Sequence, residues 1–308
     1  MMTFRVGAAA SPTVSGAIAE YYLTDTLNAE SVRAAEYYVG REERIDGFWH
    51  REVIDGRLEM RQHRAELRRD ISPELAVRLA LDDRPLTHAR VANLLSLQTA
   101  DGDPIEGRKK HSAGADGKRP PVGFIDLTLS APKSLSVAWA LASTADEREQ
   151  LLGIHRTAVE KTMQYVAEEI GHTRRGGKNN RRTEPGDIAW IGFHHYTARP
   201  VGQDAADPQI HTHNIVLPHV LTESGHIGAL DLDQLNGRIK EFGYVYQAYL
   251  GTQARKLGIR VDVDKQTHTI RFSDIPEHIE ELFSKRTKEA LKNADAQAAR
   301  MGLDWREL

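Results

Sequence analysis

The sequence predicts an α+β fold, in which a central antiparallel β-sheet carries helices packed on it. The candidate strands are short and carry a polar face, which favours antiparallel strands over fully buried parallel ones. The clearest case is residues 123–129, where Asp126 and Thr128 alternate with aliphatic side chains. Helical segments are interspersed with the strands, and no internal repeat is visible. These observations together indicate one mixed sheet-and-helix architecture.

The N-terminal third is predicted to hold one strand, at residues 3–6, followed by helices. Ser72 before Pro73 indicates a helix start, because serine caps a helix N-terminus and proline suits the first helical position. The stretch 101–121 is rich in Gly, Lys and Pro, so we expect a loop there. Helices in this part are expected over residues 15–23, 31–39, 57–67, 73–81 and 87–97.

The remainder of the chain alternates strands with longer helices. Gly258 is a natural helix C-terminal stop. The basic stretch 174–185 is expected to be a flexible loop. Helices are expected up to residue 142 and over residues 146–170, 238–257 and 277–300, the last as one helix or two. Further strands are expected over residues 188–196 and 212–218, and a hairpin from 260–263 and 269–272.

Composition excludes several classes of protein. The chain has 308 residues, of which 40% are hydrophobic, enough for one large domain or two small ones. No run approaches the roughly 18 apolar residues of a membrane span, and the N-terminus does not have the pattern of a signal peptide. The absence of cysteine excludes disulfides and thiolate metal sites, so His, Asp or Glu must hold any metal. A cytoplasmic location fits this composition.

Basic residues are clustered although the net charge is −3. Such clusters can neutralise DNA phosphates while the remaining surface stays acidic, but solvated loops would look the same. The largest cluster is the candidate DNA-binding set Arg174, Arg175, Lys178, Arg181 and Arg182.

His211 and His213 form the strongest chemical signal. In a strand, side chains two residues apart point to the same face, so two imidazoles there could chelate one divalent ion. A preceding candidate strand carries His194 and His195, and an antiparallel neighbour could supply a third imidazole. Alternation along that strand does not choose between the two.

Two tyrosine pairs, Tyr21-Tyr22 and Tyr37-Tyr38, form the second signal. Adjacent helical residues lie about 100° apart, so only one of each pair can face a given site. Packing against a core would equally explain such aromatic pairs. The polar stretch 24–30 between the pairs is expected to let the second pair move.

Asp126 is the third signal, because a carboxylate on a central strand needs a partner. A metal-bound histidine commonly donates its second N–H to such a carboxylate. An ion pair with Lys133 or an arginine is the plainer explanation.

These motifs together resemble the relaxase domain of the TrwC/TraI (MobF) family of conjugative relaxases, within the HUH endonucleases. The family pattern has tyrosine pairs, then D-L-T-x-S-A-P-K-S, then F-x-H-x-T-S-R followed by D-P-Q-L-H-T-H. This sequence matches it in order at residues 126–134, 193–199 and 207–213, and a later F-S-x-R match starts at Phe283. It departs from the pattern at Ala198, where serine is usual, and in a longer segment before His211.

The resemblance implies a relaxase palm fold and a metal-dependent single-stranded DNA endonuclease and strand transferase. It selects His195, with His211 and His213, as ligands of one divalent ion (Mg, Mn, Zn, Ni or Co). It implies Tyr21 as the nucleophile that forms a 5′-phosphotyrosine, Tyr37 as a second nucleophile and Asp126 as the group that orients a ligand histidine or accepts the tyrosine proton. Lys133 of the motif joins the candidate DNA contacts.

The resemblance also implies partners and context. The DNA is expected to be single-stranded and hairpin origin-of-transfer DNA, with accessory relaxosome and coupling proteins as further partners. We expect residues 1–308 to be one relaxase domain and the N-terminal part of a longer protein. Three alternatives stay open: a rolling-circle replication initiator, a hydrolytic metal-dependent nuclease and a DNA-binding module with a structural metal.

Overall fold

The computed structural model describes most of the chain outside the N-terminal quarter. The helix predicted over 31–39, with Tyr37 and Tyr38, lies outside the described residues, as do the connection 25–30, Lys178 and Arg181. The described ranges are residues 2–9, 12–24, 66–67, 71–82, 84, 86–107, 121–176, 180, 182–198, 201 and 206–302.

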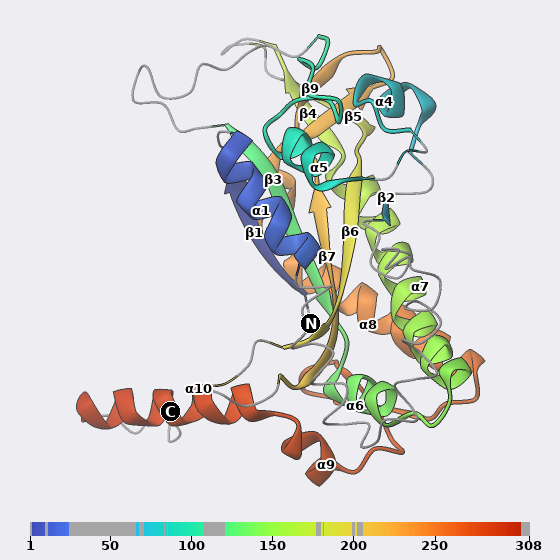
Figure 1. Cartoon of the computed structure of the whole chain (residues 1–308), viewed down its shortest axis with the longest axis vertical. Helices are drawn as coiled ribbons and strands as arrows, with labels where there is room; N and C mark the ends of the chain where they lie inside the picture. The colour runs from blue at the N-terminus through green and yellow to red at the C-terminus, as the bar shows by residue number, and fades with distance from the viewer. Residues whose placement is uncertain are drawn as a thin grey trace, which may run out of the picture.

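A five-stranded antiparallel sheet forms the centre of the molecule, as predicted (Figure 1). Its strand order is β1-β3-β7-β6-β2, so strands distant in sequence lie side by side. The strands are β1 (Met2–Ala8), β2 (Glu66–Leu67), β3 (Val122–Ser130), β6 (Trp190–Thr197) and β7 (Pro208–Val216). The helix predicted over 57–67 is wrong at its described end, because residues 66–67 pair with β6 instead.

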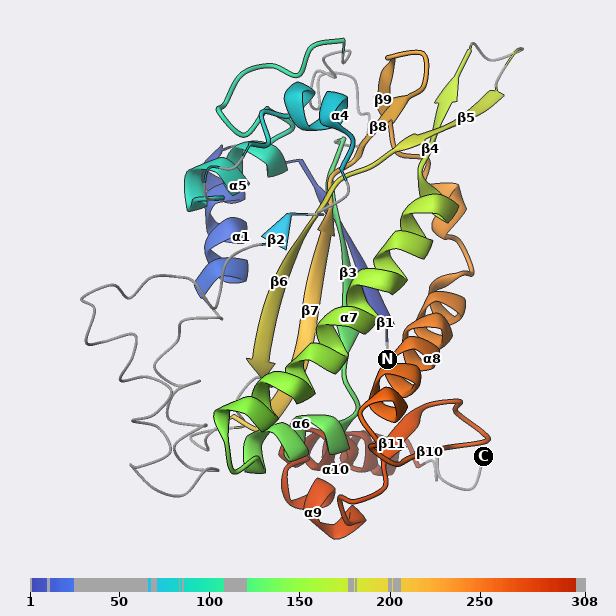
Figure 2. The same ribbon diagram turned by 90° about the vertical axis from the view of Figure 1, so that its right-hand side faces the viewer.

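Helices cover both faces of this sheet (Figure 2). On one face, Ile125, Leu127 and Leu129 belong to an apolar core shared with three helices. These helices are α6 (Lys133–Leu141), α7 (Ala145–Ile170) and α8 (Ile239–Lys256). Their positions agree with the predicted ones. Because successive side chains of a strand point to opposite faces, the aliphatic face of the sheet needs helices to cover it.

The opposite face holds a second apolar core, built around Tyr22, Phe124 and Phe193. Three other helices cover it: α1 (Pro12–Thr24), α4 (Pro73–Arg78) and α5 (His88–Leu95). The Ser72 side chain accepts a hydrogen bond from the Leu75 N–H, so the predicted cap of α4 is confirmed. The described part of 101–121, residues 101–107 and 121, contains no helix and no named strand, as expected.

A second sheet, of order β4-β5-β8-β9, corrects the predicted loop over 174–185. Thr173 is buried, and its hydroxyl donates to the Ala229 carbonyl, which fixes the start of this segment. Because the segment has few apolar residues, periodicity did not reveal it. The strands are β4 (His172–Arg175), β5 (Arg182–Asp187), β8 (His219–Thr222) and β9 (Ile227–Ala229), followed by the 3-10 helix η1 (Leu232–Leu235).

The C-terminal part follows the prediction closely. Gly258 has a φ of +74°, which ends α8 as glycine commonly does. The predicted hairpin is β10 (Val261–Val263) with β11 (Ile270–Phe272), and the charged stretch is two helices, α9 (Glu277–Leu282) and α10 (Lys285–Arg300). In Figure 1, α10 extends away from the sheet.

Candidate metal centre and tyrosine site

Three histidines converge on the sheet face that α1 covers. His195 in β6 lies directly opposite His211 in β7, and His213 follows two residues further along the same face. One ring nitrogen from each lies within 4.8 Å of the others. His194 points to the other face, where its Nδ1 lies 2.8 Å from Thr212 Oγ1. The structure therefore brings together the three histidines that the resemblance selected.

Each of the three imidazoles gives one N–H to an oxygen atom. His195 Nε2 donates to the Tyr22 carbonyl at 3.1 Å and His211 Nδ1 to the Gln209 carbonyl at 2.9 Å. His213 Nδ1 lies 2.8 Å from the Asp126 carboxylate. Since carbonyls and carboxylates only accept, the second nitrogen of each ring carries a lone pair when that ring is neutral. Burial lowers the pKa of His195 to about 4, which keeps that ring neutral.

This donor set fits a divalent ion. Neutral imidazoles whose other nitrogen is fixed by an oxygen are the usual arrangement around transition metals in proteins. The described residues offer three such nitrogens, His195 Nδ1, His211 Nε2 and His213 Nε2, and solvent or a substrate oxygen can complete the shell.

Asp126 accepts hydrogen bonds from several groups and is buried. Besides His213, Tyr22 donates its hydroxyl to Oδ2 at 2.9 Å and Thr128 donates to Oδ1 at 3.0 Å. Thr128 Oγ1 also lies 3.0 Å from His213 Nδ1. Neither Tyr22 nor Thr128 was predicted to contact Asp126. Thr128 could have been found from its position two residues after Asp126, on the same strand face.

The fold places the two tyrosines of the first pair in different environments. Tyr22 is 1% exposed, while Tyr21 is 39% exposed with its ring centroid 6.3 Å from that of His213. Burial, and then the charge and hydrogen bond of Asp126, raise the pKa of Tyr22. Tyr21 is thus the member of the pair that is open to an incoming strand beside the histidines.

The described candidate DNA contacts are hydrogen-bonded or ion-paired within the protein. Lys133 is half-buried at the start of α6, where its Nζ donates to the Pro208 carbonyl at 3.0 Å. Burial lowers the pKa of Lys133. In the β4–β5 hairpin, Arg174 pairs with Asp231 and Asp233.

The other two described arginines of the hairpin share one carboxylate. Arg175 and Arg182 each lie 3.0 Å from a Glu184 oxygen. All three described arginines therefore have acidic partners within the protein. They could meet a phosphate only with their remaining N–H groups or by exchanging partners.

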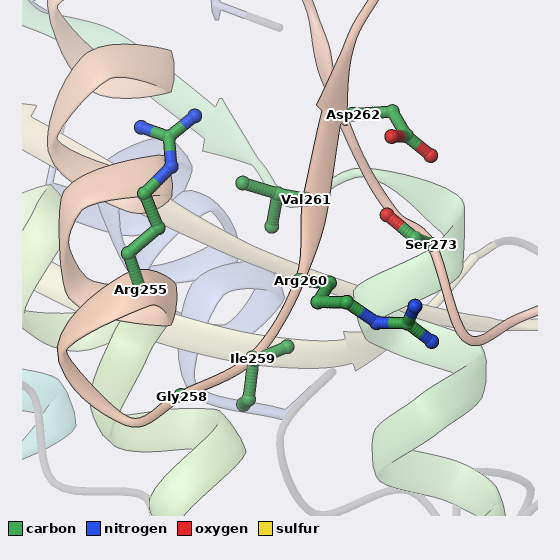
Figure 3. A pocket seen from close by; sticks show the side chains of 7 residues that line it. All are labelled: Arg255, Gly258, Ile259, Arg260, Val261, Asp262 and Ser273. Carbon is green, nitrogen blue, oxygen red and sulfur yellow. The ribbon is translucent and has the colours of Figure 1, made fainter.

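A pocket of about 510 Å³ lies elsewhere, between the end of α8 and β10 (Figure 3). Arg255, Arg260 and Asp262 are among its lining residues, and none of the three converging histidines is. Arg260 is already paired with Asp274 at 2.5 Å. This pocket is separate from the histidine cluster.

Comparison with known proteins decides the family. A family model described as TrwC relaxase matches residues 15–306. The chain belongs to the TrwC relaxase family. Membership confirms both the expected relaxase assignment and the expected enzyme class. A comparison with curated proteins found no match.

Solved relaxase structures share the fold. A metal-bound structure of the conjugative relaxase TrwC with oriT DNA is 22% identical, with a TM-score of 0.69. TrwC with a 27-mer DNA comprising the recognition hairpin and the cleavage site is 21% identical, with a TM-score of 0.63. In both cases 100% of this chain and 86% of the other chain are covered. The expected α+β palm is therefore confirmed, and no described helix is long and apolar enough to cross a membrane.

Proposed function

We propose that this relaxase nicks single-stranded origin-of-transfer DNA at one site on one strand and later rejoins it during conjugative transfer. The nick is a transesterification in which Tyr21 is the nucleophile. The observation that carries the proposal is the set of three imidazoles, each oriented by an oxygen, beside an exposed tyrosine. Related TrwC structures are complexes with oriT DNA or with DNA that comprises the recognition hairpin and the cleavage site, and two hold a metal, which is copper in one; this supports the same substrate and cofactor class here.

The reaction exchanges one phosphodiester for another. The Tyr21 oxygen attacks phosphorus, the bond to the 3′ oxygen breaks, and the leaving strand takes a proton to become a 3′-hydroxyl. The product is a 5′-phosphotyrosine that keeps the bond energy, so rejoining needs no ATP. An unperturbed tyrosine has a pKa of about 10 and needs activation. A divalent ion on His195, His211 and His213 would polarise the scissile phosphate and lower that pKa.

Asp126 is proposed as a positioning group. Its three hydrogen bonds, from His213, Tyr22 and Thr128, support orientation of the imidazole over acceptance of the Tyr21 proton. Neutral imidazoles favour Mn, Co, Ni or Zn over Mg by ligand softness. Tyr37 keeps its proposed role as a second nucleophile for strand exchange, although it lies outside the described residues.

Several broader expectations stay proposals. The family match over residues 15–306 supports residues 1–308 as one relaxase domain. A longer parent protein, accessory relaxosome and coupling partners, and a cytoplasmic location remain predictions.

Three alternative functions differ from this proposal in the residues they need or in the product they leave. A rolling-circle initiator usually pairs HxH without a third histidine from a preceding strand, so the convergence of His195 with His211 and His213 disfavours it. A hydrolytic nuclease would use the histidines and water but not Tyr21. A binding module with a structural metal would cut nothing.

The test incubates the protein with Mn²⁺ and a labelled single-stranded origin oligonucleotide, followed by denaturing electrophoresis. We expect a labelled band at the mass of protein plus DNA, lost in His211→Ala and retained in His278→Ala, which changes an exposed histidine on α9. A free cleaved strand without that band would mean hydrolysis. No cleavage at all would favour the binding module.

A further inference from the structure

The sheet face behind the histidine cluster carries a chain of buried polar side chains. In the register of β6 and β7, His194 lies opposite Thr212, next to the pair His195 and His211. Thr212 Oγ1 is 2.8 Å from His194 Nδ1 and 2.8 Å from His155 Nε2 of α7. His155 Nδ1 is 2.7 Å from the Tyr246 hydroxyl of α8. The chain thus joins two helices to the two strands that carry the cluster.

Hydrogen-bond chemistry makes these four groups interdependent. The single hydroxyl proton of Thr212 can go to only one imidazole, so Thr212 must accept from the other. Every link then runs in one direction along the chain, from Tyr246 through His155 and Thr212 to His194 or the reverse. Burial holds the pKa of His155 well below its usual value, so the ring is neutral. Removing one member takes away a hydrogen-bond partner of a buried ring nitrogen or hydroxyl oxygen.

These hydrogen-bonded polar side chains lie in an unusual place for a protein core. Thr212 stands between His211 and His213, and His194 is adjacent to His195, in a layer whose other members are mostly aliphatic. Apolar side chains of similar shape could fill this space without buried polar atoms that need partners. Because neighbouring residues in a strand share one backbone, holding Thr212 and His194 from behind also fixes the backbone that carries the front histidines.

We propose that Thr212 and His155 are positioning residues, which hold β6 and β7 from behind so that His195, His211 and His213 keep the spacing that binds an ion. This inference rests on the proposed function, which assigns those three histidines to the metal. It concerns two buried residues that are not among the proposed metal ligands, and it gives the buried polar side chains a role beyond stability. Loss of groups that support metal ligands typically lowers affinity about 10–100-fold.

The test compares two substitutions at one position. Thr212→Val keeps the β-branched shape and removes the hydroxyl, whereas Thr212→Ser keeps the hydroxyl. Titration with Co²⁺ alone, followed by visible absorption, measures affinity and ligand geometry. We expect Thr212→Val to bind Co²⁺ roughly tenfold more weakly with an altered spectrum, and Thr212→Ser to restore both. Single-turnover cleavage at saturating DNA should fall in the same order.

A matched control separates positioning from stability. Thr162 of α7 is also buried, but its hydroxyl donates to the Ala158 carbonyl of its own helix. Thr162→Val should lower the melting temperature and leave Co²⁺ affinity unchanged. If Thr212→Val behaves in the same way, the buried polar side chains are only structural and the inference is wrong. His155→Phe decides the question by the same readouts if Thr212→Val does not fold.

One more variant distinguishes failure of this inference from failure of the proposed function. His211→Ala should lose Co²⁺ binding if the three histidines form the metal site. Wild-type affinity in His211→Ala would overturn the proposed function, and the inference with it. Loss in His211→Ala with wild-type affinity and spectrum in Thr212→Val would overturn the inference alone.

Discussion

Tyr21 and Tyr22 are adjacent in α1, yet the fold gives them opposite environments. Tyr22 stacks on Phe193, at 5.4 Å between ring centroids, and donates its hydroxyl to Asp126. Tyr21 lies at the surface beside His213. A nucleophile must reach phosphorus, and a buried phenol that already donates to a carboxylate cannot do so without leaving its position. We therefore propose that Tyr22 supports Asp126, which in turn orients His213.

Tyr22→Phe tests this division. The change removes one hydrogen bond to a buried carboxylate, which typically costs about 1–3 kcal/mol of unfolding free energy. We expect the covalent adduct to form, but more slowly. Urea denaturation and single-turnover cleavage measure the two effects, with Tyr21→Phe as the control that keeps stability and loses the adduct. A stable Tyr22→Phe protein that forms no adduct would assign the attack to Tyr22.

Asp126→Asn tests the orienting carboxylate. Asparagine keeps the size but weakens the hydrogen bond to His213, so metal affinity should fall about 10–100-fold. Calorimetry with Ni²⁺ measures it, and Asp262→Asn on β10, an exposed carboxylate by the separate pocket, is the control. Equal affinity in Asp126→Asn and wild type would show that His213 does not depend on this carboxylate.

Structural elements that depend on short-range sequence signals could be predicted from the sequence. The cap at Ser72, the stop at Gly258 and the alternation around Asp126 are short-range signals, and each gave the observed structure. The β4–β5 hairpin is held by contacts with residues distant in sequence, such as the hydrogen bond from Thr173 to the Ala229 carbonyl. Local sequence signals do not reveal such contacts, so this segment was predicted as a loop. Short strands like β8 and β9 carry too few residues for periodicity to detect.

The candidate site shows the same limit. His211 and His213 follow from spacing alone, but choosing His195 over His194 required the family resemblance, since alternation fits either until the register of β6 and β7 is known. Only the fold shows that Tyr22 meets Asp126 across 104 positions of sequence.

The start of α10 is attached to the strand that carries the histidines. Asp207, buried just before β7, accepts the Lys285 N–H of α10 at 2.7 Å, and its own carbonyl accepts the Ala198 N–H. A carboxylate at a helix N-terminus also favours the helix dipole. Asp207→Ala should release the first turn of α10, at a cost of about 0.5–2 kcal/mol.

Hydrogen exchange at the first-turn amides of α10 measures this release. Glu289→Ala, an exposed change further along α10, is the control and should leave exchange at that turn unchanged. Unaltered protection in Asp207→Ala would show that other contacts anchor the helix.

The β4–β5 hairpin gives a contrast between two arginines. The Arg182 side chain is 68% exposed, whereas Arg174 is held by Asp231 and Asp233. Arg182→Gln should weaken DNA binding and reduce the salt slope by about 1, while Arg174→Gln should mainly lower stability. Binding isotherms at several salt concentrations test this. An unchanged slope in Arg182→Gln would count against the hairpin as a DNA contact.

The two faces of the central sheet carry different groups of residues. One face gathers Tyr21, Asp126 and the three histidines under α1, and the other holds the long helices and the buried polar chain. A rigid sheet suits this chemistry, since misplacement of reacting groups by about 1 Å can cost a hundredfold in rate. Transesterification needs the tyrosine to remain attached to DNA until rejoining, so the covalent intermediate is the product that distinguishes this account from hydrolysis.

Mass spectrometry of that intermediate is the most direct measurement. The protein is incubated with metal and an unnicked origin oligonucleotide, digested with nuclease and protease, and searched for phosphotyrosine carrying a 5′ nucleotide. We expect the modification on the peptide that contains Tyr21, and none in Tyr21→Phe, whereas Tyr37→Phe should keep it. Modification at Tyr22, Tyr37 or Tyr38 with none at Tyr21, or cleaved DNA with a free 5′-phosphate and no adduct, would contradict it.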